Sequence, residues 1–511
     1  MWLTLTVWPP RAFPGDILLP SPLPTDLTEI ELTYAGDQPM PAVTLNGSSP
    51  MPPVQSYRPF VPILNLSSSL GEARSFGPCQ TSTRRLDVGI ALEWDGSDND
   101  RCGQRVALHR EKFALDLLSY ETLRLRGRSN APVVIALEDA AAGRREDNLP
   151  IATVEGPFDL AVPLRTLGRR LDLRMLTALV FSGAGQNRAI QIEEVAFIQG
   201  PPVVAEPAGV GFWVWNYREA ISDADSVVAA CRGQRCTRVL VQMPSQSDSE
   251  ETWRAYTMVL GTLQKAGIDA WALDGYPEAI QAPHLLADKV RRLFAGLTPG
   301  TVAGIQFDIE PYVLPGFLKD EPQLRRYLDC IDILKEVIGG RARLSMVIPF
   351  WLAAPTVGGR PLAYAVMDRA DEVAVMSYRT DLEEVGKISE DLLRYGDLTG
   401  TSVWLAVETT PLPVEQHVVL RRDPHADRAD AVVDVDRRLL RWLPVSEVPP
   451  GRQEWFRIHH RFTVRPERLT FAGRPRIEVT AAVRRLLAAT AHRSLAGVMI
   501  HDLTGFLSLP D

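Results

Sequence analysis

Residues from about 85 to 200 contain short runs in which apolar and polar residues alternate, and turn residues separate these runs. Alternation with a period of two predicts strands that are buried on one face only. Many short strands with frequent turns favour an antiparallel β-sandwich, arranged as a jelly roll. Six runs show the pattern, at 86–92, 122–127, 133–138, 158–162, 177–182 and 190–197.

A different pattern begins at residue 210, where apolar runs alternate with longer segments whose apolar residues recur at helical spacing. Alternating strands and helices predict parallel pairing, and eight such units in about 300 residues favour a closed (β/α)8 TIM barrel over an open doubly wound sheet. No Gly-rich phosphate loop follows the first strand, which argues against a nucleotide. The strand-like runs lie at 210–215, 238–243, 268–273, 300–312, 343–348, 372–378, 402–408 and 495–500.

The chain is therefore predicted to have several domains. A β-sandwich spans 1–200, and an α/β barrel spans 209–511 after the Pro-rich linker 201–209. Residues 412–473, between the seventh strand and its helix, form an insertion far longer than a usual barrel loop, which predicts a lid or the wall of a binding site. The His459–His460 pair in this insertion fits a solvated surface better than a metal site, because its spacing does not bring ligands together.

Composition and charge exclude several classes of protein. Hydrophobic residues make up 45% of the 511 residues and charged residues 23%, with a net charge of −8, as is typical of a globular protein. The basic residues are scattered among carboxylates, so we expect no nucleic-acid partner. No apolar run reaches the length of a membrane span. The apolar segment 1–8 lacks a preceding basic residue and is cut short by Pro9 and Pro10, so it is a poor secretion signal.

The five cysteines do not have the spacing of metal ligands, so we expect neither a metal nor another cofactor. Cys231 and Cys236 are five residues apart near the end of a predicted helix, which would place them on different faces. A bridge between Cys79 and Cys102 is possible. The odd number of cysteines leaves the compartment undecided.

The fourth strand of the predicted barrel carries the strongest chemical signal. Side chains two apart on a strand face the same way, so Gln306, Asp308 and Glu310 are predicted to share one face, opposite a run of apolar residues. Three polar groups on a buried strand are costly unless they are satisfied or functional. They lie at the carboxyl end of a barrel strand, where the active sites of such barrels are found.

The carboxyl ends of all eight strands converge on one mouth, which is predicted to be rich in aromatic rings and carboxylates. Aromatic rings stack on sugar rings, and paired carboxylates cleave glycosidic bonds as acid and base. The predicted partner is therefore a carbohydrate, either a polysaccharide or a glycan, which would favour an extracellular or periplasmic protein. The predicted substrate-binding residues are Trp213, Trp215, Asn216, Gln242, Asp274, Gln306, Tyr312, Trp351, Arg379 and His501.

Three segments resemble the family 18 glycoside hydrolases, the chitinase-like enzymes. Residues 303–312 (Ala-Gly-Ile-Gln-Phe-Asp-Ile-Glu-Pro-Tyr) resemble the Asp-x-x-Asp-x-Asp-x-Glu signature of their fourth strand. Residues 375–378 (Val-Met-Ser-Tyr) and 497–502 (Gly-Val-Met-Ile-His-Asp) resemble motifs of their sixth and eighth strands. The resemblance implies that Glu310 is the general acid, Asp308 its electrostatic partner and Tyr378 the group that holds a reacting acetamido group. Ala303, Gln306, Arg379 and His501 depart from the family pattern.

Two alternatives accompany this resemblance. Glu310 on strand four and Glu408 on strand seven also resemble the two-Glu arrangement of the large clan of retaining barrel enzymes, in which the second carboxylate is the nucleophile. The sandwich resembles the galactose-binding-like modules that accompany carbohydrate enzymes. The predicted function is glycoside hydrolysis; a non-catalytic carbohydrate-binding protein or an accessory protein of polysaccharide synthesis is the alternative.

Overall fold

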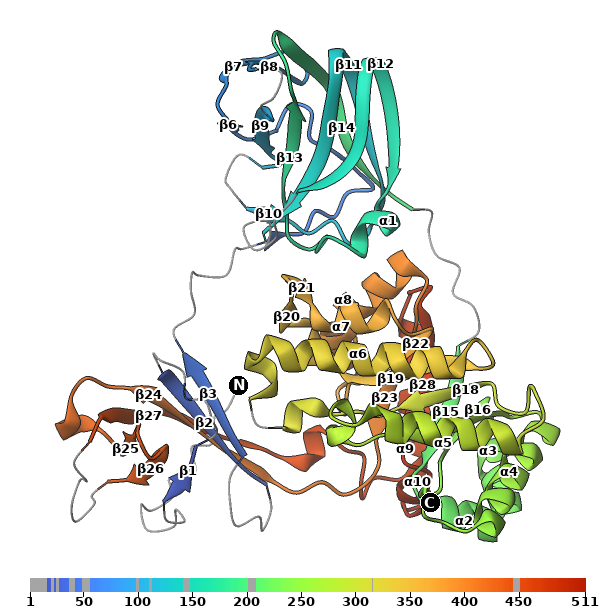
Figure 1. Ribbon diagram of the computed structural model, residues 1–511. Coiled ribbons are helices and arrows are strands. Elements are labelled where there is room, and N and C mark those ends of the chain that lie inside the picture. Colours follow the sequence, from blue (N-terminus) through green and yellow to red (C-terminus); the bar gives the residue numbers. More distant parts are fainter. Residues whose placement is uncertain are drawn as a thin grey trace.

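The computed structural model confirms the predicted fold class, an antiparallel β-sheet domain followed by a closed eight-stranded parallel barrel (Figure 1). It describes residues 16–19, 23, 27–35, 42–47, 56–97, 101–109, 113–140, 148–200, 208–314, 316–443 and 451–511. The predicted apolar segment 1–8 and most of the predicted linker lie outside these residues. Within the described ranges, no helix is long and apolar enough to cross a membrane.

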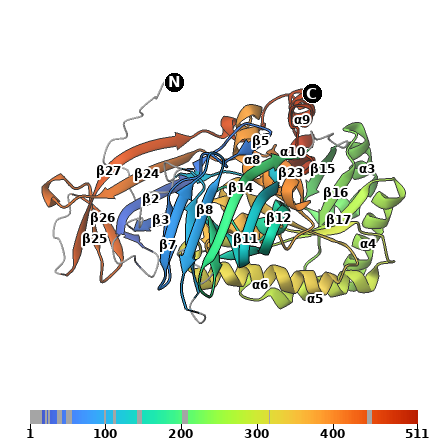
Figure 2. The same cartoon turned by 90° about the horizontal axis from the view of Figure 1, so that it is seen from above.

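The barrel closes through parallel pairing of consecutive strands, and helices surround it (Figures 1 and 2). Its strands are β15 (Gly209–Val214), β16 (Arg238–Gln242), β17 (Asp269–Asp274), β18 (Gly304–Phe307), β19 (Arg343–Pro349), β22 (Glu372–Met376), β23 (Ser402–Glu408) and β28 (Leu495–His501). The helices are α2 (Tyr217–Ser222), α3 (Ala224–Gly233), α4 (Glu250–Lys265), α5 (Pro283–Gly296), α6 (Glu321–Ile338), α7 (Leu362–Met367), α8 (Leu382–Thr399), α9 (Arg476–Ala489) and α10 (Leu503–Leu507).

A buried cation fills the barrel interior below the mouth. The Arg238 guanidinium lies 4.3 Å from the ring centroid of Trp271 and 4.0 Å from that of Trp404, and it pairs with Glu372 at 2.5 Å. A Cβ atom added at Gly304 would come within 2.0 Å of the Trp271 ring, so this strand needs glycine to admit the indole. The cation–π contacts and the ion pair together fill the end of the barrel opposite the mouth.

The sandwich is an antiparallel domain built around one long bent strand, β11 (Tyr120–Asp139). Its first half pairs with β14 (Arg188–Gln199) and its second half with β13 (Leu176–Gly183), while β12 (Leu149–Pro163) pairs along both halves. The other elements are β4 (Ser56–Tyr57), β5 (Ile63–Asn65), β6 (Ala73–Phe76), β7 (Gln80–Arg85), β8 (Ile90–Asp95), β9 (Cys102–Ala107), β10 (Ala114–Leu115) and α1 (Leu164–Gly168).

A third sheet combines strands from the two predicted domains. Strand β2 (Leu27–Ala35), which falls within the predicted sandwich domain, instead pairs antiparallel with β24 (Glu415–Arg422) of the insertion. The insertion is therefore a sheet domain completed by the amino-terminal strands, with its own apolar core around Ile30, Leu420 and Phe456. Its other strands are β1 (Ile17–Leu18), β3 (Ala42–Gly47), β25 (Ala431–Asp434), β26 (Leu439–Trp442) and β27 (Gln453–Val464). Strand alternation predicts a half-buried strand but does not identify its partner.

Ion pairs join the sandwich to helix α8 of the barrel. Arg394 is buried and donates to both carboxylate oxygens of Asp116, at 2.6 and 2.8 Å, and to Ser119 Oγ at 2.8 Å. Arg174 of the sandwich donates to Asp391 at 2.9 Å. Bidentate pairing of this kind fixes orientation as well as distance, so the two domains are docked in one arrangement.

His492 provides a pH-dependent contact beside this interface. It lies 2.6 Å from Asp397 and 3.2 Å from Glu390, and Glu390 also accepts from Arg58 of the sandwich at 2.9 Å. Burial alone would lower the pKa of His492, but the hydrogen bonds to Asp397 and Glu390 outweigh it and raise the pKa to about 9. A folded-state pKa above the ordinary 6.5 means that His492 stabilises the protein fully below pH 6.5.

We therefore expect His492→Gln to lower the free energy of unfolding most below pH 6.5, and its effect to disappear as the pH rises through about 9. Urea unfolding of both proteins at pH 6, 8 and 9.5 measures the difference. An exposed histidine, His425, gives the control His425→Gln. A difference that does not change with pH would show that His492 contributes only by packing.

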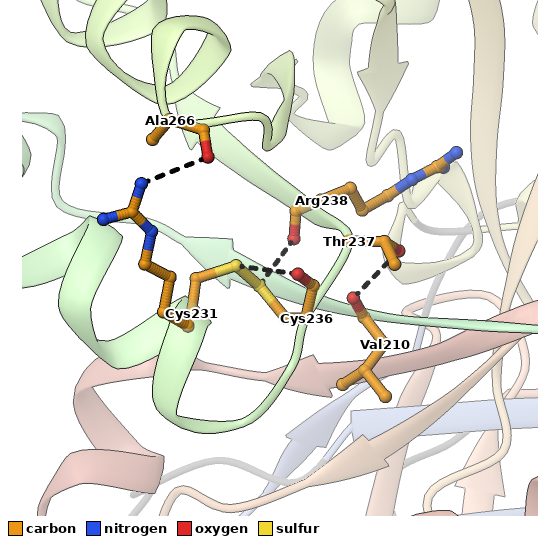
Figure 3. Close-up of a disulfide and its surroundings, with 7 residues drawn as sticks. Val210, Cys231, Cys236, Thr237, Arg238 and Ala266 are labelled. Atoms are coloured by element: carbon orange, nitrogen blue, oxygen red, sulfur yellow. Dashed lines mark hydrogen bonds between the residues drawn. A yellow bond between two sulfur atoms is a disulfide. The ribbon is translucent and has the colours of Figure 1, made fainter.

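One disulfide corrects the prediction for Cys231 and Cys236. The two residues form a disulfide in the turn between α3 and β16 (Figure 3). Helix α3 ends at Gly233, and Arg235 has a left-handed φ of 53°, so the chain reverses and the Cys236 N–H donates to the Cys231 carbonyl at 2.9 Å. The helical-face rule fails because Cys236 lies outside the helix. The predicted bridge between the described residues Cys79 and Cys102 is not formed in the structure, although both lie against Gly96.

Candidate active site

Strand β18 and the residues after it present two faces, as the sequence pattern predicts. Ile305, Phe307 and Ile309 are buried in the core between the barrel and its helices. Asp308 and Glu310 face the mouth, where each is partly exposed. Burial and the nearby Glu310 carboxylate raise the pKa of Asp308 to about 7, although His501 opposes this shift. The Asp308 carboxyl group therefore keeps its proton in part of the molecules at neutral pH.

Gln306 lies deeper than these two residues, inside the barrel. It is 1% exposed, accepts a hydrogen bond from Trp213 Nε1 and donates to Ser345 Oγ at 2.8 Å. Trp213 is likewise buried within the barrel. These two predicted substrate-binding residues lie beneath the mouth and form its floor. Their polar atoms hydrogen-bond to one another, so they can be buried there.

Aromatic residues hold Glu310 in place. The Tyr312 hydroxyl donates to Glu310 Oε1, and burial together with this carboxylate raises the pKa of Tyr312. The Tyr312 ring meets the Trp351 ring edge to face, with centroids 4.9 Å apart. Trp351 lies in the short helix η5 (Phe350–Ala353) directly after β19. A ring pair in this geometry stabilises both side chains and orients the Tyr312 hydroxyl.

A buried pair lies across the mouth. Glu408, at the end of β23, is 2% exposed, and its Oε2 lies 2.8 Å from His501 Nδ1 at the end of β28. Its Oε1 accepts from the backbone N–H groups of Thr409 and Thr410 at 2.8 and 2.6 Å, and from the Thr410 hydroxyl at 2.7 Å. Burial would lower the pKa of His501, but the hydrogen bond to Glu408 and the nearby carboxylates raise it. Thr409 and Thr410 were not among the predicted site residues, although they directly follow Glu408 in the sequence.

The His501 ring is at the centre of the aromatic part of the mouth. Its centroid lies 5.6 Å from that of Trp213, 6.3 Å from Trp215 and 5.9 Å from Tyr378. Burial and the carboxylates Glu408, Asp308 and Glu310 raise the pKa of Tyr378, so it keeps its proton. The structure thus brings the four predicted catalytic residues to one place.

Among the described residues, Trp215 Nε1, a donor, and Asp308 Oδ1, an acceptor, are buried at the mouth without a hydrogen-bond partner. Buried polar atoms without partners are uncommon in folded proteins, and a ligand hydroxyl or amide would satisfy both kinds. In the described part of the chain, no group of three or more His, Cys, Asp or Glu side chains is arranged to hold a metal ion. Trp215 Nε1 and Asp308 Oδ1 therefore leave one donor and one acceptor available at the mouth.

The remaining predicted residues are placed differently. Asp274 is buried and pairs with Lys289 of α5, so it faces the helices rather than the mouth. Leu273 lies inside the barrel, and the next residue on a strand points outwards. Asn216 is exposed and caps α2, accepting from the N–H groups of Arg218 and Glu219. Asp274 thus lies on the side of its strand away from the mouth, and a role of Asn216 in substrate binding stays a prediction.

Arg379 and Gln242 lie at the rim. Arg379 donates to Glu384 of α8 at 2.7 Å and packs over the Phe350 ring, so its charge is neutralised within the protein. Gln242 ends β16 on the same side as Leu240, which lies inside the barrel, and it is half-buried. Its place on the strand points it towards the mouth.

The proton on Asp308 gives a stability prediction. A carboxyl group with a folded-state pKa of about 7, above its ordinary 3.8, keeps a proton that the unfolded chain releases. The stability of the protein should therefore fall as the pH rises between these two values. The amide in Asp308→Asn does not titrate, so the free energy of unfolding of this variant does not fall in this way. Relative to the native protein, the variant should become more stable as the pH rises from about 4 to 7, and the difference should stay constant above pH 7.

Urea unfolding at pH 4, 5.5, 7 and 8 tests this prediction. The matched control is Asp329→Asn, which alters an exposed aspartate of α6. If the difference between Asp308→Asn and the native protein is the same at every pH, Asp308 has an ordinary pKa and is not coupled to Glu310.

Comparisons with known proteins give distant similarities. No protein-family model and no curated protein sequence matches the chain. The structure is similar to a chitinase from Bacteroides thetaiotaomicron, with 11% identity over 59% of this chain and 91% of that chain and a TM-score of 0.34. A Clostridium thermocellum xylanase 10B fragment with carbohydrate-binding and catalytic modules gives 11% identity, 68% and 80% coverage and a TM-score of 0.26.

The sandwich has a similar distant counterpart. A family 11 carbohydrate-binding module from Clostridium thermocellum gives 13% identity over 27% of this chain and 95% of that chain, with a TM-score of 0.21. Identities and TM-scores this low do not establish what a chain binds or catalyses. A function has to come from the residues of the mouth.

Proposed function

We propose that the protein is a glycoside hydrolase whose active site is the mouth of the barrel. The observation that carries the proposal is the pair of carboxyl groups directly after β18, Asp308 and Glu310; burial and the nearby Glu310 carboxylate raise the Asp308 pKa to about 7. A proton kept on a carboxyl group at neutral pH is what a general acid needs to protonate a glycosidic oxygen. The surrounding rings would hold the sugar.

Each residue has a role in this proposal. Glu310, oriented by Tyr312, donates the proton to the leaving oxygen. Asp308, in its ionised form, stabilises positive charge that develops on the sugar, and a water molecule adds to the sugar carbon from which the leaving oxygen departs. Tyr378, which keeps its hydroxyl proton, donates a hydrogen bond to the reacting group. Trp215 stacks on the sugar ring and presents a free N–H to a hydroxyl or amide.

The contacts of Glu408 favour a positioning role over a nucleophilic one. One of its oxygens accepts three hydrogen bonds from Thr409 and Thr410, and the other pairs with His501. A nucleophilic carboxylate has to give up such contacts in order to attack. In the two-Glu alternative, a separation of about 5 Å between Glu310 and Glu408 would retain the configuration and about 6.5–9.5 Å would invert it. NMR of the first-formed product distinguishes these outcomes.

A second function is a non-catalytic carbohydrate-binding protein, including an accessory protein of polysaccharide synthesis. The satisfied side chain of Gln306 favours it, because the family signature has an acid at this position and an amide cannot supply a proton. Both functions predict saccharide binding, but only one predicts cleavage.

Release of reducing ends separates the two functions. We would incubate the purified protein with acetamido polysaccharides, such as glycol chitin, and with plain ones, such as xylan and mixed-linkage β-glucan. The proposal predicts that new reducing ends appear with at least one class, and the class identifies the sugar. Binding of a polysaccharide without any release of reducing ends would support the non-catalytic function.

A further inference from the structure

A cleft of about 630 Å³ lies between the sandwich and the barrel. The sandwich contributes Arg58, and the barrel contributes η5 and the second and third turns of α8. Sites for small ligands commonly have volumes of about 300–1,000 Å³ and often lie between domains. Its lining residues are Arg58, Phe350, Ala353, Gly386, Lys387, Ile388, Glu390 and Asp391.

Phe350 connects the lining of the cleft with residues at the rim of the mouth. Phe350, which lines the cleft, directly precedes Trp351 in η5, and Trp351 packs on Tyr312, the residue that holds Glu310. Arg379, at the rim of the mouth, packs over Phe350 with its guanidinium 5.3 Å from the ring centroid. The short helix η5 therefore borders both the cleft, through Phe350, and the residues that hold Glu310, through Trp351.

The lining suits an uncharged polar chain. Arg58 and Lys387 carry positive charge, and Glu390 and Asp391 carry negative charge, so the cleft favours neither anions nor cations. Arg58 is already paired with Glu390 at 2.9 Å, and Asp391 with Arg174 at 2.9 Å. Paired groups of this kind still offer donors and acceptors to hydroxyl groups, and Phe350 and Ile388 offer an apolar surface.

We propose that this cleft is a distal subsite for the uncharged polysaccharide chain cleaved at the mouth. The inference rests on the proposed function for the identity of its ligand. Saccharides long enough to reach from Glu310 past Trp351 gain contacts in the cleft, whereas short ones occupy the mouth alone. The sandwich thus takes part in substrate binding through Arg58 at its edge with α8.

Gly386 offers a way to block the cleft. It lies within α8, lines the cleft, and has no atom within 4 Å of the position where a Cβ would stand. A tryptophan at this position would fill the cleft without disturbing the packing, and a helix interior prefers other residues to glycine. Gly261 of α4 is the matched control, because it is also a half-buried helical glycine with open space at its Cβ.

The experiment compares Gly386→Trp and Gly261→Trp, each combined with Glu310→Gln to prevent turnover. Xylan, glycol chitin and mixed-linkage β-glucan, and their oligosaccharides of two to eight sugars, are the probes, and calorimetry measures binding. We expect Gly386→Trp to weaken binding of the longest oligosaccharides at least tenfold and to leave the disaccharide unchanged, while Gly261→Trp changes neither. Thermal unfolding confirms that both variants are folded.

The outcomes separate this inference from the proposed function. Equal binding of long oligosaccharides by Gly386→Trp and Gly261→Trp overturns the distal subsite, even if the native protein hydrolyses the polymer. Weaker binding by Gly386→Trp, in a native protein that releases no reducing ends, supports the subsite and overturns hydrolysis. If none of the probes binds to the Glu310→Gln protein with an intact cleft, the subsite is overturned.

Discussion

Glu310→Gln should lower the rate of polysaccharide hydrolysis by about 10²–10⁴-fold, because a glutamine cannot donate the proton that the leaving oxygen needs. The amide is close to the carboxyl group in size and can still accept the hydrogen bond from Tyr312. Saccharide binding should therefore be retained. Initial rates of reducing-end release and calorimetric titration of an oligosaccharide measure the two effects separately.

The matched control is Glu336→Gln, which alters an exposed glutamate of α6 and should change neither quantity. Asp308→Asn provides a second comparison, since it removes the neighbouring carboxyl group but leaves the acid in place. If Glu310→Gln hydrolyses the substrate as fast as the native protein, Glu310 has no part in the reaction.

Glu372→Gln should destabilise the protein by about 3–5 kcal/mol, the usual cost of breaking a buried ion pair. Glu372 is 0% exposed, and its carboxylate pairs with Arg238 at 2.5 Å and with Arg343 at 3.4 Å. Without this carboxylate, the Arg238 charge stays buried between Trp271 and Trp404 without an anion. Urea unfolding at pH 7 measures the loss.

Two further variants show whether the effect comes from the ion pair. Glu321→Gln breaks an exposed pair with Arg325 on α6 and should cost less than about 1 kcal/mol. The double variant Arg238→Met, Glu372→Leu removes both charges and should be more stable than Glu372→Gln, because no unpaired charge is left inside the barrel. A double variant that is less stable than the single one would contradict this explanation.

The sequence was sufficient for the barrel and for the central strand of the site. Apolar runs that alternate with helical segments can be recognised from local patterns alone. Because each barrel strand pairs with the next barrel strand along the chain, these patterns were enough to predict the barrel. The alternation along β18 and the residues directly after it likewise depends on spacing alone, so the opposite faces of Ile309 and Glu310 could be predicted. On β17 the same rule puts Asp274 and Leu273 on opposite faces of the strand. Leu273 lies inside the barrel, so Asp274 lies on its outer side.

Other features depend on contacts that sequence spacing does not reveal. Strand β2 pairs with β24, nearly 400 residues away, because their apolar faces share one small core, and no local pattern identifies such a partner. The Cys231–Cys236 disulfide depends on where α3 ends, and helix ends are poorly defined by periodicity. The pairing of Glu408 with His501 depends on the closure of β23 against β28.

The most direct test of a saccharide-cleaving mouth is a crystal structure of the Glu310→Gln protein with an oligosaccharide substrate. We predict a sugar ring against Trp215, with a glycosidic oxygen within hydrogen-bonding distance of the Gln side chain at position 310 and polar groups near Asp308 Oδ1. An oligosaccharide that occupies only the sandwich or the outer surface of the barrel, and leaves the mouth empty, would contradict this account.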